Sequence, residues 1–93
     1  MTDYSNKLRA IREAEGLTQS AFAEAAGLNA RSYQNAENGF RSPGLAMIEA
    51  VARRWPQYAR WLLTDETRPD HGDVSPEQER ARRDSARDGT HVA

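Results

Sequence analysis

The sequence contains no cysteine and only two histidines, and these absences exclude several kinds of site. Without cysteine the chain forms no disulfide, no thiolate zinc site and no cysteine nucleophile. Both histidines, His71 and His91, lie beyond residue 70, so we expect no metal site. There is also no nucleophile–base constellation and no glycine-rich phosphate loop. The sequence therefore predicts no catalytic residue, no cofactor and a protein that is not an enzyme.

Long apolar runs are missing too. No segment approaches the roughly 20 apolar residues of a membrane span, and the polar stretch from Thr2 to Lys7 does not resemble a signal peptide. We therefore expect a cytoplasmic protein without a membrane partner. With 93 residues, of which 38% are hydrophobic and 29% charged, the chain is sized for one small domain.

An excess of positive charge is absent as well, since the formal net charge is −1. The distribution is uneven, however: residues 1–64 hold eight Lys or Arg and six Asp or Glu, whereas residues 65–93 hold five and eight. Nucleic-acid affinity depends on a local basic face more than on the total charge. The composition therefore permits DNA as a partner. The small basic excess of residues 1–64 favours a dimer that combines two such faces in salt-sensitive binding.

The first 64 residues contain helical periodicity without strand alternation. In the fourth periodic segment, Ile48, Val51 and Trp55 belong to a stripe with a period of 3.6 residues. Ser42 followed by Pro43 predicts the N-cap and first position of this helix. The expected helices are residues 4–15, 18–26, 29–38, a fourth that starts at 42 and is broken at 56, and 56–64, which makes the domain all-α.

Residues 17–39 predict two helices joined by a tight turn. Thr18 and Asn29 suit helix N-caps, Gly27 provides the permissive backbone of the turn, and Gly39 ends the second helix. A polar helix at a fixed angle to its partner fits the DNA major groove, although an exposed polar face is also typical of a merely solvated helix. Outward side chains that can hydrogen-bond to base edges or phosphates are Asn29, Arg31, Ser32, Gln34 and Asn35.

The large aromatic side chains Phe22, Trp55 and Trp61 are expected in the core. If the helix over residues 56–64 has more apolar surface than its own domain can cover, the exposed remainder would form a dimer seam. The candidates for this seam are Tyr58, Trp61, Leu62 and Leu63.

Residues 65–93 differ sharply in composition from the first 64. Residues 65–74 are rich in Asp, Arg, Pro and Gly and predict a linker. A capping box from Ser75 to Gln78 and the opposite charges of Glu79 and Arg83 favour a helix over residues 76–87. Because this helix offers only alanines for burial, we expect it to be frayed or disordered. The chain thus divides into a helical domain, residues 1–64, and a charged, flexible tail, residues 65–93.

Three stretches at matching spacing carry a resemblance to a known family. They are LRAIREAEGLTQ, AEAAGLNARSYQNAENG, and SPGLAMIEAVARRW followed by YARWLL. They resemble the phage-repressor and Cro-like helix-turn-helix family, the XRE-type regulators, over roughly residues 8–63. The resemblance implies a five-helix, lambda-repressor-like DNA-binding domain with the helix-turn-helix at its second and third helices. It also implies a dimer on a two-fold-related operator in double-stranded DNA.

The resemblance implies roles for individual residues. Gln19 would contact the phosphate backbone, as would Asn38 and Arg41 at the far end of the recognition helix. Arg31 would pair with guanine. The full set of expected DNA-binding residues is Gln19, Asn29, Ala30, Arg31, Ser32, Gln34, Asn35, Asn38 and Arg41.

Arg12 and Glu37 match a partly buried salt bridge of the family, which would lock the first helix to the end of the recognition helix. The sequence departs from the family at Tyr33, where Ile or Val is usual. We expect the Tyr33 ring at the core edge, with room made by the small Ala36, and its hydroxyl at solvent or a phosphate. Phe40 replaces a residue that is frequently basic, which weakens the phosphate contact there.

Two functions fit these expectations. The first is a sequence-specific DNA-binding transcriptional regulator, a small prophage-type repressor or autoregulator that occupies an inverted-repeat operator as a homodimer. The second is an antitoxin-type protein, whose tail would bind and neutralise a protein partner while the helical domain represses its own operon. The two functions share a DNA-binding domain and differ in whether the residues beyond Thr64 have a partner.

Overall fold

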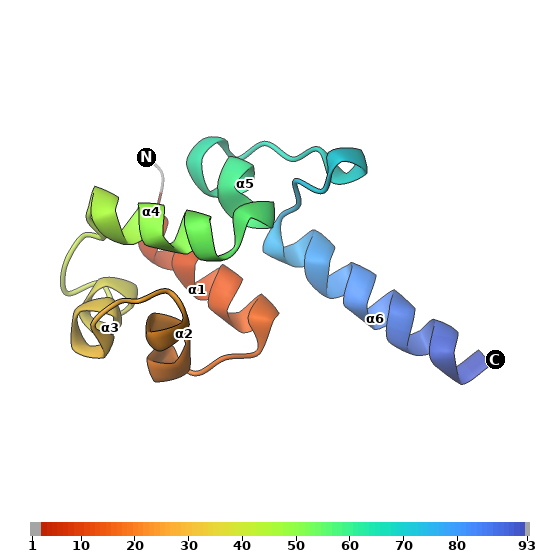
Figure 1. Ribbon diagram of the computed structural model, residues 1–93, viewed down its shortest axis with the longest axis horizontal. Coiled ribbons are helices and arrows are strands. Elements are labelled where there is room, and N and C mark those ends of the chain that lie inside the picture. Colours follow the sequence, from red (N-terminus) through yellow and green to blue (C-terminus); the bar gives the residue numbers. More distant parts are fainter. Residues whose placement is uncertain (1–2, 93) are drawn as a thin grey trace.

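The computed structural model describes the backbone of residues 3–92 and the side chains of residues 3–86. Within this range the elements are helical (Figure 1), which confirms the all-α prediction. A 3₁₀ turn, η1 (Pro56–Tyr58), precedes the fifth α-helix, and another, η2 (Pro69–His71), precedes the sixth. The α-helices are α1 (Tyr4–Glu15), α2 (Gln19–Ala25), α3 (Ala30–Glu37), α4 (Leu45–Arg54), α5 (Ala59–Thr64) and α6 (Pro76–Val92).

The first three helices begin where local capping signals indicate. The side chains of Asp3, Thr18 and Asn29 accept hydrogen bonds from the backbone N–H groups three residues further on, at 3.1, 3.1 and 3.0 Å. Each bond satisfies a donor that a helix N-terminus leaves free. α1 ends at Gly16, whose φ of 69° is the left-handed conformation that glycine adopts without strain. The predicted helices over residues 4–15, 18–26 and 29–38 are therefore present, with ends that differ by at most one residue.

The fourth and fifth helices differ from prediction at their starts. α4 begins at Leu45 with Gly44 as its N-cap, two residues after the position that Ser42 and Pro43 predict. The backbone of Gly44 is extended, with φ −79° and ψ 166°, the conformation typical of an N-cap residue, so the helix starts only after it. The single helix expected over residues 56–64 is divided into η1 and α5.

The core lies among helices α1 to α5 and η1. Phe22 of α2 stacks on Trp55 at the end of α4, with ring centroids 4.4 Å and planes 4° apart, and the Tyr33 ring of α3 lies 5.0 Å from Phe22. This aromatic group ties the second and third helices to the fourth. The other buried apolar side chains are Leu8, Ile11, Ala14, Ala23, Ala36, Ile48, Val51, Tyr58 and Leu62.

The candidate dimer seam is largely inside this core. Tyr58 and Leu62 have no exposed surface, so the seam prediction is wrong for both, because the core of the protomer covers them. Trp61 packs partly buried against the core, with the Lys7 ammonium 4.9 Å from its ring centroid. Leu63, which is 53% exposed, is the candidate that offers the most surface.

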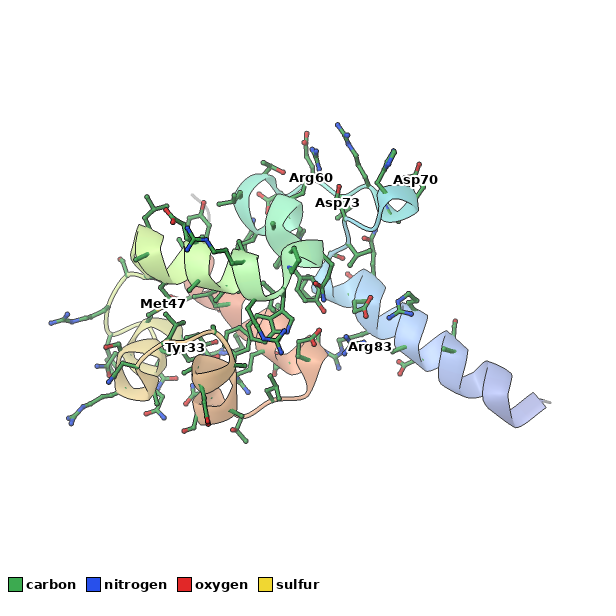
Figure 2. All side chains as sticks on the ribbon, in the orientation of Figure 1. Tyr33, Met47, Arg60, Asp70, Asp73 and Arg83 are labelled. Atoms are coloured by element: carbon green, nitrogen blue, oxygen red, sulfur yellow. The ribbon has the colours of Figure 1, made fainter. Side chains whose placement is uncertain are left out.

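Residues 65–75 form an ordered connection, which differs from the free linker that their composition predicts. The Val74 N–H donates to the carbonyl of Gln57 at 2.9 Å, and Arg68 forms an antiparallel backbone bridge with Asp73. Arg60 of α5 reaches the same connection, with its Nε 3.3 Å from Asp73 Oδ2 (Figure 2). The contacts of Arg60 with Asp73 and of Val74 with Gln57 join residues 13 and 17 positions apart, so local composition does not indicate them.

α6 packs its first half against α1, whereas the sequence predicts a frayed or disordered helix. Arg83 donates from Nη1 to the Ala14 carbonyl and from Nη2 to the Glu15 carboxylate, both at 3.0 Å (Figure 2). Tyr58 donates its hydroxyl to the same carboxylate at 2.6 Å. The prediction counted only apolar burial and missed this docking through charged side chains. We name Glu15, Tyr58, Glu79, Arg82 and Arg83 the α6 cluster.

Glu79 is the carboxylate of α6 within this cluster. It is 6% exposed, and Arg83 Nε donates to it at 2.7 Å while Arg82 donates to both of its oxygens at 2.9 and 2.6 Å. Beyond the cluster, α6 extends away from the other helices to its C-terminal end (Figure 1). Whether residues 1–64 form a DNA-binding domain by themselves stays a prediction.

Candidate nucleic-acid interface

α2 and α3 form a helix–turn–helix at the opposite end of the molecule from the C-terminal end of α6 (Figure 1). The chain turns at Gly27, whose φ is 73°, and the Leu28 N–H donates to the Ala23 carbonyl at 2.8 Å. On the inner side Phe22 and Ala23 of α2 are buried, as is Tyr33 of α3. Because the inner faces are packed, the outer face of α3 is left for a partner.

The outer face of α3 is polar and accessible. Arg31 and Ser32 are exposed, and Ala30, Gln34 and Asn35 are partly exposed. Among the residues that the structure describes, the guanidinium of Arg31 has no hydrogen bond or ion pair, so its donors are available for a ligand. The guanidinium of Arg41, in the loop after α3, is likewise exposed and without a partner within the described residues.

Three other predicted contact residues have partners inside the protein. Asn29 Oδ1 accepts the Ser32 N–H as the cap of α3, and Asn38 Oδ1 lies 3.2 Å from the amide nitrogen of Gln19. Gln34 Nε2 lies 3.5 Å from the hydroxyl of Ser20 on α2. The two asparagines use an acceptor oxygen in these contacts, so their amide nitrogens can still donate to a phosphate or a base.

Gln19 is placed differently from its expected phosphate contact. Its amide nitrogen donates to Glu37 Oε2 at 2.5 Å and to Asn38 Oδ1 at 3.2 Å. An amide nitrogen has two hydrogens, and both are used here. A phosphate oxygen accepts hydrogen bonds but does not donate them, so the Gln19 side chain would have to leave these partners to hold a phosphate.

Glu37 is the buried carboxylate at the end of α3, and donors from three helices converge on it. Arg12 Nε lies 2.6 Å from Oε1 and Arg12 Nη2 lies 3.1 Å from Oε2, so the predicted ion pair is present and bidentate. The Tyr33 hydroxyl donates to Oε1 at 2.6 Å, and Gln19 donates to Oε2. We name Arg12, Gln19, Tyr33 and Glu37 the Glu37 cluster.

The Glu37 carboxylate is held in its charged form. Burial alone would raise the pKa of Glu37, but the hydrogen bonds from Arg12, Tyr33 and Gln19 outweigh this effect and lower the pKa below its ordinary value. Burial and the bond to Glu37 raise the pKa of the Tyr33 hydroxyl well above its ordinary value. At neutral pH the cluster therefore consists of a carboxylate, a guanidinium, a neutral phenol and a neutral amide.

The expectation that the Tyr33 hydroxyl reaches solvent or a phosphate is wrong. Tyr33 is fully buried, since its hydroxyl finds an acceptor four residues further along the same helix, where Glu37 lies one turn away. Figure 2 shows the labelled side chain between α3 and the body of the domain. Tyr33 is thus not available to DNA in this arrangement.

The comparison with protein families agrees with this geometry. The family model described as Helix-turn-helix matches residues 8–54, half of the chain, a span that runs from α1 to the end of α4. The chain belongs to the XRE/Cro-like helix-turn-helix family. It is a DNA-binding transcription regulator, and its family is not an enzyme family. A search of curated proteins finds no match to the chain.

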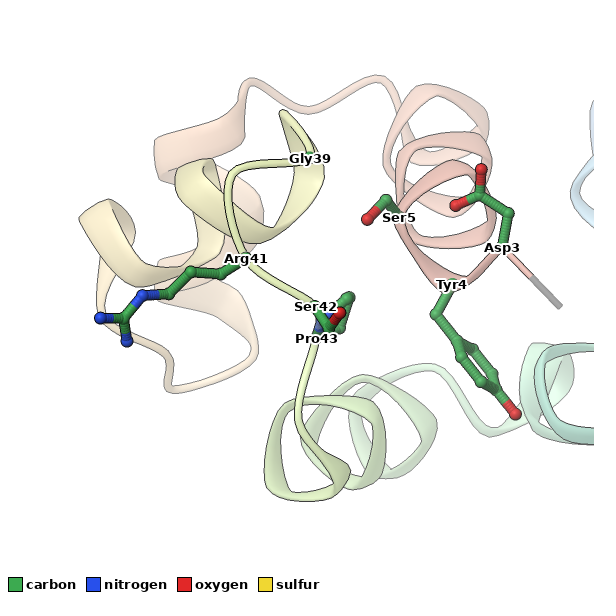
Figure 3. A pocket seen from close by; sticks show the side chains of 7 residues that line it. All are labelled: Asp3, Tyr4, Ser5, Gly39, Arg41, Ser42 and Pro43. Atoms are coloured by element: carbon green, nitrogen blue, oxygen red, sulfur yellow. The ribbon is translucent and has the colours of Figure 1, made fainter. Parts of the chain in front are cut away.

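The loop after the recognition helix of this helix-turn-helix regulator keeps Arg41 on the outside. The N–H groups of Phe40 and Arg41 donate to the Asn35 carbonyl at 2.9 and 3.2 Å, which continues the end of α3 into the loop. Figure 3 shows the Arg41 side chain directed away from α1. Phe40 is 78% exposed. A hollow of about 460 Å³ separates the loop from the start of α1 and is lined by Asp3, Tyr4, Ser5, Gly39, Arg41, Ser42 and Pro43.

Sequence reasoning about this regulator missed how many partners Glu37 has. It named Arg12, but it assigned Gln19 to the phosphate backbone and the Tyr33 hydroxyl to solvent or a phosphate. The spacing of Tyr33 and Glu37, four residues apart on a helix, was a signal for the bond between them. No comparable signal links Gln19 to Glu37.

None of the helices within residues 3–92 combines the length and the apolar character needed to cross a membrane.

Proposed function

We propose that this regulator represses transcription by occupying an operator as a homodimer, with α3 in the major groove. The observation that supports this most strongly is the unpartnered guanidinium of Arg31 on the outer face of α3. Arginine donates two parallel hydrogen bonds to guanine O6 and N7, the commonest specific contact in the major groove. The base-contacting set is then Ala30, Arg31, Ser32, Gln34 and Asn35.

Contacts to DNA phosphates would lie on either side of this base-contacting set. Arg41 supplies a free cation after the recognition helix, and the amide nitrogens of Asn29 and Asn38 supply neutral donors at the two ends of α3. Gln19 contributes by holding Glu37 and Asn38, or releases them to reach a phosphate. Such contacts set the position of the helix on the duplex but carry no sequence information directly.

Two considerations favour a dimer, the small basic charge of one copy and the two-fold symmetry of an inverted-repeat operator. Residues 1–64 have only a small excess of basic residues, so one copy neutralises few phosphates. Two copies related by a two-fold axis would double that number and select an inverted repeat with half-sites about one helical turn apart. Leu63, exposed on α5, and the partly exposed Trp61 are the members of the predicted seam that are left to contribute to such a dimer.

In-vitro selection from a random pool of DNA duplexes tests this proposal. Sedimentation of the complex with the most enriched duplex then gives the number of protein copies bound. We expect an enriched inverted repeat bound by two copies. A folded protein that enriches no sequence would overturn the proposal, and a single bound copy would overturn its dimeric part.

The antitoxin-type alternative needs a tail that is free to bind another protein. The α6 cluster engages Glu79, Arg82 and Arg83 within the chain, so a partner would have to displace the first half of α6 or use what lies beyond it. We therefore favour the operator-binding function. Co-purification of a protein partner with the whole chain, lost when residues beyond Thr64 are removed, would reverse this preference.

A further inference from the structure

Tyr33 is placed where it can control the geometry of the recognition helix without touching DNA. Its ring is fully buried and lies 5.0 Å from Phe22 of α2. Its hydroxyl donates to Glu37 Oε1 at 2.6 Å, in a buried environment. The ring and the hydroxyl of one side chain thus contact two different parts of the recognition unit.

The bond from Tyr33 completes the coordination of the Glu37 carboxylate. A carboxylate has about four acceptor positions, and here Oε1 receives Arg12 and Tyr33 while Oε2 receives Arg12 and Gln19. The side chain of Glu37 is 1% exposed, so water has little access to replace a missing donor. Loss of one donor would leave the carboxylate free to turn toward the remaining ones.

The carboxylate in turn fixes residues next to the DNA-facing surface. Gln19, at the start of α2, holds both Glu37 and Asn38, the C-cap of α3. Arg12 joins the same carboxylate to α1 and also donates to the Leu17 carbonyl at 2.9 Å, just before α2 begins. A rotation of the Glu37 carboxylate would therefore shift the start of α2 relative to the end of α3.

We propose that Tyr33 is a positioning residue for sequence-specific DNA binding. Its hydroxyl fixes the Glu37 carboxylate, and the carboxylate fixes the relative placement of α1, α2 and α3, on which the base contacts of Gln34 and Asn35 depend. This inference rests on the proposed function of α3. Non-specific binding depends on phosphate charges with loose geometry, so it should not need the Tyr33 hydroxyl.

The chain contains a matched control for this role. Tyr58 is also fully buried, and its hydroxyl also donates to a glutamate carboxylate at 2.6 Å, that of Glu15. It lies in η1 and supports the α6 cluster, which does not include a residue of α2 or α3. Tyr33→Phe and Tyr58→Phe therefore remove the same chemical group from the same kind of bond in two places.

The test compares wild type, Tyr33→Phe and Tyr58→Phe on the selected duplex and on a scrambled duplex, at a temperature where circular dichroism shows all three folded. We expect both variants to melt earlier than wild type. Tyr33→Phe should bind the selected duplex about three- to tenfold more weakly, the scale of one ordinary intramolecular hydrogen bond, and should bind the scrambled duplex within about twofold of the wild-type affinity, since non-specific binding rests on phosphate charge. Tyr58→Phe should bind both duplexes like wild type.

Three outcomes would overturn the inference. One is equal affinity of Tyr33→Phe and wild type for the selected duplex, because the hydroxyl would then only stabilise the fold. Another is an equal loss on both duplexes or in both variants. The third is a wild type that selects no duplex, which overturns the proposed function first and this inference with it.

A second measurement covers the case in which Tyr33→Phe is poorly folded. The comparison is then repeated in trimethylamine N-oxide, which favours the folded state, and amide hydrogen exchange is recorded with it. We expect faster exchange in Tyr33→Phe confined to the backbone of residues 34–39, and unchanged exchange in α4. Protection of residues 34–39 equal to that of wild type would count against the proposal.

Discussion

The two carboxylate clusters of this protein use the same side-chain types for different purposes, one in the recognition unit and one in the attachment of α6. Each joins a buried tyrosine hydroxyl, a glutamate and an arginine, with a tyrosine–glutamate distance of 2.6 Å in both. The Glu37 cluster is the more enclosed: the side chain of Glu37 is 1% exposed and that of Arg12 18%. In the α6 cluster the side chain of Glu15 is 13% exposed and that of Arg83 is 38%.

This difference in burial determines how much stability the protein loses when one residue of each cluster is removed. Removing one partner of a buried ion pair strands the other charge in a place with little water, which is strongly destabilising. Near the surface, solvent screens the charge that is left and can replace the lost bond. The recognition unit therefore depends on an enclosed cluster, whereas α6 is attached by a cluster that can be broken at lower cost in stability.

The largest effect is expected from Glu37→Ala. It leaves Arg12, Tyr33 and Gln19 without their common acceptor, and we expect a loss of about 3–5 kcal/mol of unfolding free energy. Glu15→Ala, its counterpart in the α6 cluster, should lose about 1–2 kcal/mol. Urea denaturation followed by circular dichroism measures both losses. Equal losses would mean that burial does not separate the two clusters.

A smaller effect, on binding only, is expected from Arg31→Ala. It removes the free guanidinium from α3 and should cost about 1–3 kcal/mol on the selected operator and relax the preference at one base pair. Its melting temperature should equal that of wild type, since the Arg31 side chain has no partner within the described residues. Arg53→Ala is the control, because Arg53 is 82% exposed on α4. Similar affinity losses in the two variants would remove Arg31 from the base-contacting set.

Arg83→Ala should break the α6 cluster and leave the Glu37 cluster intact. We expect a loss of about 1–2 kcal/mol in unfolding free energy, rapid amide exchange throughout α6 and unchanged DNA affinity. Arg80→Ala is the control, since Arg80 is exposed on the same helix and outside the α6 cluster. Weaker operator binding by Arg83→Ala alone would show that the two clusters are not independent.

The smallest effect is a change in the acid sensitivity of stability. Because the folded-state pKa of Glu37 is lowered, its charged form stabilises the fold fully above its unfolded pKa of about 4.3. This contribution is lost as the pH falls through the folded pKa. Glu37→Gln lacks this titration, so its urea midpoint should fall less steeply than that of wild type between pH 5 and pH 3. Parallel profiles would contradict the charged state assigned to Glu37.

The parts of the fold that the sequence predicts are those governed by local chemistry. Thr18 and Asn29 cap their helices through N–H groups three residues away, and Gly27 turns the chain where a positive φ is needed. The predicted start of α4 was wrong for a local reason as well, because Ser42 and Gly44, two residues apart, can each serve as a helix N-cap. Local rules rank such options only roughly.

The parts that could not be predicted depend on contacts between distant residues. Nothing around Arg83 indicates that its guanidinium will meet Ala14 and Glu15, 69 and 68 residues away. Gln19 has two amide hydrogens that would suit a phosphate as well as a carboxylate, and the fold decides between them. The resemblance to the family named Arg12 and Glu37 but not the additional donors to Glu37.

The extension of α6 beyond the other helices gives the molecule an elongated outline that scattering can measure. The principal extents are 46 × 25 × 20 Å and the Cα radius of gyration is 13.9 Å, against about 12 Å for a compact chain of this length. Small-angle X-ray scattering of the unlabelled protein in solution is therefore sensitive to the orientation of α6. Release of α6 would change its position relative to the centre of mass and so alter the low-angle curve before any helix unfolds.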